Sequence, residues 1–306
     1  MMEAIIIGIA KSAIRLATPY LYASIGETIG QLSGVLNLGV DGVMLMGAFS
    51  AFYTVLKTGN LWLGLLVAIV VGAIFGLLIA FINVTLKAEQ GISGIGVYIF
   101  GLGLSSLLFR TMVGTVQAVS GFPILFIPLL SNIPVVGEIF FQQNILVYGA
   151  FALVPISWFI LNKTPLGLSI RAVGQHPEAA DSLGVNIVRI RYFTVILGGM
   201  LSGIAGASLS IALLNVFQQN LTNGMGFIAV ALVYFGAWRP LSVLSGALLF
   251  STVNAIQIWI QVKGINVPSD FTLMLPYIVT IVVLAAMAKR YVRPPKALNK
   301  PFERGE

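Results

Sequence analysis

Residues 162–191 read NKTPLGLSIRAVGQHPEAADSLGVNIVRIR, and this polar stretch separates two long apolar blocks. It carries six charged side chains: Lys163, Arg171, Glu178, Asp181, Arg189 and Arg191. A segment this polar cannot lie in the hydrocarbon core of a bilayer. Because loops rich in Lys and Arg stay on the cytoplasmic side of a membrane, the stretch predicts a cytoplasmic loop.

The chain of 306 residues is 58% hydrophobic and only 9% charged, with a mean hydropathy of +0.98. Soluble domains carry about a quarter charged residues. The sequence therefore predicts an all-α polytopic membrane protein, with one transmembrane domain over residues 1–306. If residues 26–36 also enter the membrane, the spans number ten, so we expect about eight to ten transmembrane helices. Apolar segments long enough to cross a bilayer lie near 4–24, 36–56, 62–86, 92–112, 144–162, 191–214, 223–237, 240–262 and 271–288.

Charge predicts which side of the membrane each connection faces. The turn at 86–91, the loop at 163–191 and the basic tail at 289–306 should be cytoplasmic. The segment 113–143 contains no Lys or Arg and several prolines, which disfavour a regular helix, so we expect it to form an extracytoplasmic cap. The C-terminus is then cytoplasmic, whereas the side of the N-terminus stays open.

The cytoplasmic loop contains the signals of a short helix. Pro177 suits a first helical position, Gln175 or His176 would be the cap, and Gly184 is a natural stop. A helix over 177–183 would place three apolar side chains on one face: Ala179, Ala180 and Leu183. Because two turns are unstable alone, the helix is either a connector held by its neighbours or a segment that docks on a partner.

Composition also excludes several functions. The chain has no Cys and a single His, so no familiar metal site can form, and it has no phosphate-binding loop for ATP. We therefore expect no catalytic residues, no metal and no cofactor in this chain. The net charge of +7 does not indicate nucleic acid, because the positive charges gather where anionic lipid would lie. They are Lys289, Arg290, Arg293, Lys296, Lys300 and Arg304.

Polar side chains at membrane depth are costly unless they are paired or face water. Asn37 stands one helical turn before Asp41, so we expect the two to share a face. Few acids lie at this depth, which favours a neutral, hydrogen-bonding solute over a proton or sodium relay. Asp41 could equally cap a helix or pair with an Arg, and the aromatic residues could serve packing alone. The candidate substrate pathway is Asn37, Asp41, Phe100, Asn215, Gln218 and Asn254.

A weak internal repeat is visible. Residues 37–47 and then 62–83 resemble residues 223–236 and then 240–257, because each pair has a glycine-dense segment before a longer apolar one. Duplicated transporters tend to bind solute between their repeats. The spacing Gly72-x-x-x-Gly76 and Gly199-x-x-x-Gly203 predicts close helix packing.

Three stretches together resemble permeases of ABC importers of the ribose, galactose and nucleoside group. They are GETIGQLSGVLNLGVDGVMLMGA at 26–48, RAVGQHPEAADSLGVN at 171–186 and NGMGFIAVALVYFGAWRP at 223–240. The sequence SGVLNLGVDG at 33–42 is more similar to the nucleoside branch than to the ribose branch. The nucleoside branch, however, often has Glu where Asp41 stands. The resemblance thus predicts import of nucleosides, with ribose, galactose or a related sugar as the alternative.

The resemblance implies partners that composition could not reveal. These are a second permease subunit, a cytoplasmic ABC ATPase that holds ATP and Mg, and an extracytoplasmic solute-binding lipoprotein, all at the bacterial cytoplasmic membrane. The loop would contain the coupling helix that docks on the ATPase. A rival of another class, a stand-alone secondary transporter or channel, predicts uptake by this chain alone. The implied coupling residues are Arg171, Gln175, His176, Pro177, Glu178, Ala179, Ala180 and Gly184.

Overall fold

The computed structural model describes residues 2–263 except 129, 130 and 132, and further 274–275, 278–279, 281–282, 285 and 293–303. In this part of the chain the regular structure is almost wholly helical, which confirms the predicted all-α polytopic class. The elements are α1 (Met2–Leu32), α2 (Val40–Thr58), α3 (Leu61–Ala80), the π-helix η1 (Phe81–Thr85), α4 (Gln90–Met112), β1 (Ile124–Phe126), α5 (Val136–Phe140), β2 (Gln142–Asn144), α6 (Ile145–Lys163), α7 (Pro165–Gln175), α8 (Pro177–Ser182), α9 (Ile187–Ser208), the π-helix η3 (Leu209–Leu213), α10 (Met225–Phe235) and α11 (Pro240–Val262).

Six helices of the described residues are long and apolar enough to cross a membrane: α2, α3 with η1, α4, α6, α9 with η3, and α11. Two further expected spans coincide with α1, which carries Lys11 and Arg15, and with α10, which is short. The stretch 26–36 is not a span of its own, because α1 continues to Leu32. The expected span 271–288 lies largely outside the described residues.

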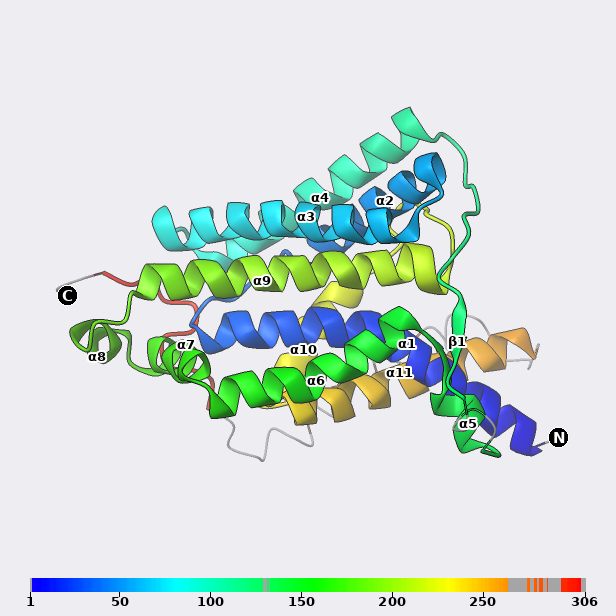
Figure 1. Ribbon diagram of the computed structural model, residues 1–306. Coiled ribbons are helices and arrows are strands. Elements are labelled where there is room, and N and C mark those ends of the chain that lie inside the picture. The colour runs from blue at the N-terminus through cyan, green and yellow to red at the C-terminus, as the bar shows by residue number, and fades with distance from the viewer. Residues whose placement is uncertain are drawn as a thin grey trace.

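The helices form a bundle with two distinct ends (Figure 1). One end carries α7, α8 and the C-terminal segment, and we call it the α8 end. The N-terminus lies at the other end with α5 and β1, the β1 end. Two contacts of α1 fix this placement: Lys11 Nζ lies 3.8 Å from Glu138 Oε1 of α5, and Arg15 Nε donates to Gln143 Oε1 of β2 at 2.9 Å.

The segment expected to form a cap, 113–143, contains little regular structure. β1 and β2 pair antiparallel over three residues each, and α5 is a single turn and a half. Its prolines and polar turns keep it outside the bundle, at the β1 end (Figure 1).

α9 packs against α1, α2 and α3, and glycines allow these close approaches. A Cβ added to Gly72 of α3 would overlap the backbone carbonyl of Gly199, and one added to Gly206 would overlap that of Met44 in α2. The predicted close packing of the two glycine motifs is therefore confirmed.

Side-chain caps set where several helices begin. Asn60, Asn144 and Asn186 accept backbone N–H bonds at the starts of α3, α6 and α9. Glu89 does the same for α4, and the N–H groups of Ile92 and Gly91 hold the pKa of its carboxyl below the usual range.

α10 is a half-length helix that begins inside the bundle. Its 11 residues extend roughly 16 Å at 1.5 Å per residue, about half of a ~30 Å hydrocarbon core. Gly226 in its first turn lies against Asp41 at the start of α2, whereas Trp238, just beyond its end, contacts Gln31 near the end of α1. α10 therefore runs from the interior to the α8 end. The two members of the expected repeat differ in length, because α2 has 19 residues.

Candidate functional site

A buried polar network occupies the junction of α1 with the connection 33–39. Glu27 Oε1 accepts hydrogen bonds from Gln31 Nε2 at 2.9 Å and from the Asn37 backbone N–H at 3.0 Å. Gln31 Oε1 in turn accepts from Trp238 Nε1 at 2.8 Å. Buried polar groups are costly unless they are hydrogen-bonded. This network therefore fixes the connection between α1 and α2 relative to the end of α10.

Asp41 is fully buried and caps α10 from the neighbouring helix. Its Oδ1 accepts from the backbone N–H of Gly226 at 2.7 Å, and its Oδ2 accepts from Thr222 Oγ1 at 2.9 Å. The carboxylate thus satisfies N–H groups at a helix N-terminus that begins away from water, where a negative charge is also favoured by the helix dipole. Of the roles open for Asp41, the structure shows that of a helix cap.

Asn37 does not share a helical face with Asp41, so that expectation is wrong. α2 begins only at Val40, and Asn37 lies in the preceding connection. Its Oδ1 accepts from the backbone N–H of Gly39 at 2.8 Å, a local turn that competes with helix formation.

The three stretches that carried the family resemblance contact one another in space. Asp41 and Gln31 of the first meet Gly226 and Trp238 of the third. The second meets the first at Gly174, where an added Cβ would overlap the carbonyl oxygen of Leu32. These contacts explain why the three stretches contain small and polar residues. The small residues lie where backbones touch, and the polar residues are buried where helices begin.

A face rich in amide side chains precedes α10. Gln218, Gln219, Asn220 and Asn223 are all exposed in the connection between η3 and α10, and we call them the amide face. Asn220 and Asn223 adopt positive φ angles, 55° and 44°, which Asn tolerates better than most residues. Exposed amides beside apolar helices cannot face lipid without cost, so this side of the bundle must face water or another subunit.

Two aromatic rings meet near the start of α10, which follows the amide face in the chain. Tyr98 of α4 and Phe227 of α10 meet edge to face, with their centroids 5.0 Å apart. Of the four residues of the amide face, only Gln218 is among the predicted pathway residues. The missed signal is the run QQNLTN at 218–223 directly before Gly224, which marks a polar entry to an otherwise apolar helix.

The other pathway candidates do not converge on one place. Phe100 projects from the opposite side of α4 to Tyr98 and stacks on Phe75 of α3, with centroids 5.9 Å apart. Asn215 lies at the end of η3, with its Oδ1 buried and without a hydrogen-bond partner among the described residues. Asn254 is half-buried on α11, across the bundle from α4 (Figure 1).

The predicted short helix of the cytoplasmic loop is present as α8. Pro177 occupies its first turn, His176 stands at the cap position, and Gly184 follows its end with φ of +83°. The prediction missed α7, which begins after Thr164, whose Oγ1 accepts from the Gly167 N–H at 3.2 Å.

The exposed face of α8 differs from the expected one. Ala180 is only 2% exposed and packs with Val173, Ile187 and Phe302, whereas Leu183 is 84% exposed. Ala179 and Glu178 are exposed as well. The expectation that Ala179, Ala180 and Leu183 form one apolar face is therefore wrong for Ala180, because a helix of six residues must bury one side against the bundle.

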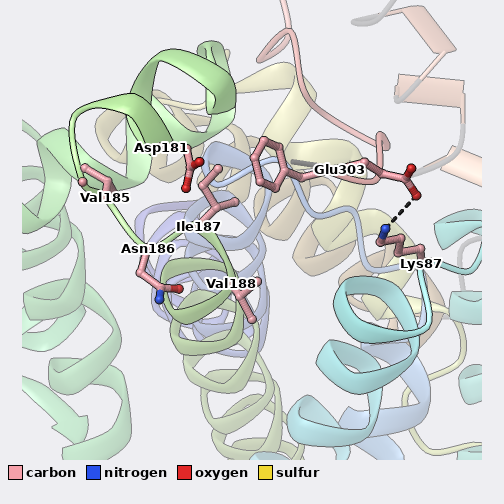
Figure 2. Close-up of a pocket in the computed structure, with 9 residues that line it drawn as sticks. Lys87, Asp181, Val185, Asn186, Ile187, Val188 and Glu303 are labelled. Atoms are coloured by element: carbon pink, nitrogen blue, oxygen red, sulfur yellow. Dashed lines mark hydrogen bonds and ion pairs between the residues drawn. The ribbon is translucent and has the colours of Figure 1, made fainter. Parts of the chain in front are cut away.

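A hollow of about 360 Å³ lies beside α8 (Figure 2). Its wall is formed by the α8–α9 connection, the turn before α4 and the C-terminal segment, with Asp181, Asn186 and Phe302 among its residues. Lys87 Nζ and Glu303 Oε1 close one side with an ion pair at 2.6 Å.

The C-terminal segment 293–303 is docked rather than freely solvated. The backbone N–H of Ala297 donates to Gly174 O at 2.9 Å, and that of Asn299 donates to Gly34 O at 3.2 Å. The buried Arg191 donates to the carbonyl oxygens of Ser33 at 3.2 Å and of Lys300 at 3.1 Å. The segment thus ties α7, α9 and the connection after α1 together.

Comparison with known proteins agrees with this architecture. The chain is 39% identical to a putative glucose ABC transporter permease protein of Haloferax volcanii, over 97% of this chain and 98% of the relative. It is 35% identical to the guanosine ABC transporter permease protein NupQ of Bacillus subtilis, over 97% of each chain. It is also 35% identical to the nucleoside ABC transporter permease protein NupC of Lactococcus lactis, over 91% of each.

No solved structure matches the chain at a significant level. The resemblance to permeases of the sugar and nucleoside group is confirmed by these relatives. A family model described as branched-chain amino acid transport system / permease component matches residues 9–284, most of the chain. The chain therefore belongs to this family of ABC transporter permeases, and it is a multi-pass membrane protein.

Proposed function

We propose that this chain is the membrane-spanning subunit of an ABC importer for nucleosides. The observation that carries the proposal is the amide face directly before α10, whose Phe227 meets Tyr98, in a chain with relatives named for guanosine and nucleosides. Amide groups donate and accept hydrogen bonds, as the edge of a nucleobase requires. Aromatic rings can stack on its flat face.

A sugar is the second candidate solute. It is favoured by the 39% identity to the putative glucose permease, and amides bind sugar hydroxyls equally well. Sugars, however, have no aromatic ring, so they can offer the rings of Tyr98 and Phe227 only a C–H face, whereas a nucleobase can stack ring on ring.

Uptake in cells that lack this chain decides between the two solutes. We expect loss of radiolabelled uridine, adenosine or guanosine uptake and normal uptake of ribose and glucose. Restoration by the intact gene is the control. Loss of sugar uptake alone would favour a sugar as the solute. If neither nucleoside nor sugar uptake is lost, both candidate solutes are excluded.

The orientation and the partners form part of the proposal. We place the α8 end in the cytoplasm, because Lys163, Arg171 and Arg189 and the basic C-terminal segment lie there. The N-terminus and the β1 end then face outward, toward a solute-binding lipoprotein. A second permease subunit covers the amide face, so that the pathway runs between the two subunits. ATP and Mg are bound by a separate cytoplasmic ATPase.

α8 and the hollow beside it form the surface on which this ATPase docks. Leu183 is the most exposed apolar side chain of this surface, and its burial by a partner would be favourable because apolar area is removed from water. Glu178, Gln175 and His176 border it and are exposed. Arg171 lies half-buried behind them, on α7.

Replacement of Leu183 by Asp is expected to weaken ATPase binding by at least about tenfold and to abolish uptake, because an unpaired charge would have to enter an apolar pocket. Co-purification of the ATPase and ATP-driven uptake in vesicles measure both effects. Glu178→Lys should act in the same direction but less strongly, since it lies at the rim.

Ser169→Asp is the matched control, because it adds the same charge on α7, at the same end but away from α8. The thermal stability of both variants should equal that of the wild type. Normal ATPase binding by Leu183→Asp would contradict the docking surface. Uptake by this chain without any ATPase would favour a stand-alone transporter.

A further inference from the structure

A second cavity at the α8 end is lined by arginines and lies apart from the amide face and from α8. Its volume is about 620 Å³. Arg171 of α7, Arg239 before α11 and Arg293 of the C-terminal segment line it, and no Asp or Glu is among its described lining residues. Arg171 and Arg239 form no ion pair with a described Asp or Glu, so they give this wall a positive potential, which favours an anion.

Two of these arginines, Arg171 and Arg239, are available for a ligand. Within the described residues, Arg171 and Arg239 form no ion pair. Arg171 donates from Nε to Gly167 O, and this hydrogen bond is long at 3.4 Å. Arg239 is exposed and stands at the start of α11, whose first turn has no side-chain cap. Guanidinium groups bind phosphate through paired N–H donors.

The cavity lies at the depth of a bilayer surface. Its wall includes Leu32, where α1 ends, Asn162, next to the end of α6, and Pro240, where α11 begins. Three helix ends at one level mark the boundary between hydrocarbon and water. Any anion in this cavity therefore lies in the layer that lipid headgroups occupy.

The cavity is also continuous with the lipid-facing surface. Trp158 of α6 and Leu241 of α11 both line it, and they are 37% and 54% exposed. Trp is enriched at this level of membrane proteins, where its ring lies between headgroups and chains. An acyl chain can lie along these side chains while the headgroup enters the cavity. A free anion would gain nothing from them.

We propose that this cavity binds the phosphate headgroup of an anionic phospholipid from the adjacent leaflet. Arg239 and Arg171 bind the phosphate. Asn162 and Gln175 donate hydrogen bonds from their amides to the glycerol or to the other polar part of the headgroup. Trp158 and Leu241 contact the acyl chains. Basic pockets between membrane helices on the cytoplasmic side are suited to such headgroups. The site stands whether the transported solute is a nucleoside or a sugar.

Thermal unfolding of the purified full-length chain in neutral detergent tests the site. Phosphatidylglycerol is expected to raise the midpoint temperature in a saturable manner, because a ligand that binds only the folded state stabilises it. Phosphatidylcholine should have little effect. In the double variant Arg171→Gln and Arg239→Gln, half-maximal stabilisation should require at least about tenfold more phosphatidylglycerol, since two charge-assisted hydrogen-bonding groups are lost.

Arg189→Gln is the matched control, because it removes the same charge at the same end of the bundle but outside the cavity. It should keep the wild-type response. If the double variant does not fold, Arg239→Lys gives the same test. It keeps the charge but loses the paired donors, so an intermediate response is expected.

Three results would overturn the proposal. An equal response of the wild type and the arginine variants would show that the lipid binds elsewhere. An equal effect of phosphatidylcholine would show that the headgroup charge is not recognised. Stabilisation by inorganic phosphate or glycerol phosphate, with the same dependence on arginine, would assign the cavity to a free anion.

Discussion

Replacement of Asp41 by Ala is expected to abolish uptake and to lower the thermal stability of the chain. The change removes both acceptors of the α10 cap and leaves the Thr222 hydroxyl and the Gly226 N–H buried without them. Loss of a helix cap costs about 0.5–2 kcal/mol, and each buried polar group left unsatisfied costs about 1–3 kcal/mol. Because α10 begins inside the bundle, no water replaces the lost acceptor at low cost.

Uptake in vesicles and the unfolding midpoint, measured on the same preparation, separate two roles of Asp41. A cap predicts that both fall together in Asp41→Ala. Asp41→Asn keeps one acceptor oxygen and should be milder in both measurements. Thr222→Val removes one of the two hydrogen bonds of Asp41. Its uptake and its unfolding midpoint should lie between those of Asp41→Ala and Asp41→Asn. Loss of uptake at unchanged stability would instead mean that Asp41 acts directly in the pathway, and wild-type behaviour would contradict both roles.

Local signals in the sequence were sufficient to predict α8. Pro177 is favoured in the first turn of a helix, and Gly184 can end one by adopting a positive φ angle. Both act within one segment of chain, so neighbours in space do not alter them. The buried face of α8 could not be predicted in the same way. Ala180 is buried because Phe302 and Ile187 cover it, and both belong to other segments.

The half-length of α10 could not be read from its composition. Residues 223–237 are apolar enough to suggest a full span, and the sequence alone does not show that the helix begins inside the bundle. That start depends on Asp41, which precedes Gly226 by 185 residues and supplies the cap. A charged residue at depth is costly without a partner, but the partner of Asp41 includes a backbone N–H group, which no side-chain pattern displays.

The amide face was largely missed for a related reason. A polar side chain at depth can point toward the bundle or away from it, and composition does not distinguish the two. The same holds for aromatic side chains. Phe100 and Tyr98 both belong to α4, but only Tyr98 meets Phe227. The docking of residues 293–303 could likewise not be predicted from the sequence, because it depends on backbone hydrogen bonds to Gly174 and Gly34.

Gly206→Ala is expected to destabilise the chain, whereas Gly96→Ala is not. Both glycines lie inside membrane helices, and both substitutions add one methyl group. At Gly206 the added Cβ would overlap the backbone carbonyl of Met44, so α2 and α9 would have to move apart. Overpacking of this kind costs about 1–3 kcal/mol. At Gly96 nothing lies within 4 Å, and Ala is the better helix former by about 1 kcal/mol.

Chemical or thermal unfolding of the two variants should therefore differ in sign, with Gly206→Ala below the wild type and Gly96→Ala at or above it. The difference also reaches function, because α2 carries Asp41 at its first turn. Moving α2 away from α9 shifts the cap of α10, so Gly206→Ala should lose uptake even where enough folded protein remains. Equal stability of the two variants would show that α2 and α9 are not in close contact at Gly206 and Met44.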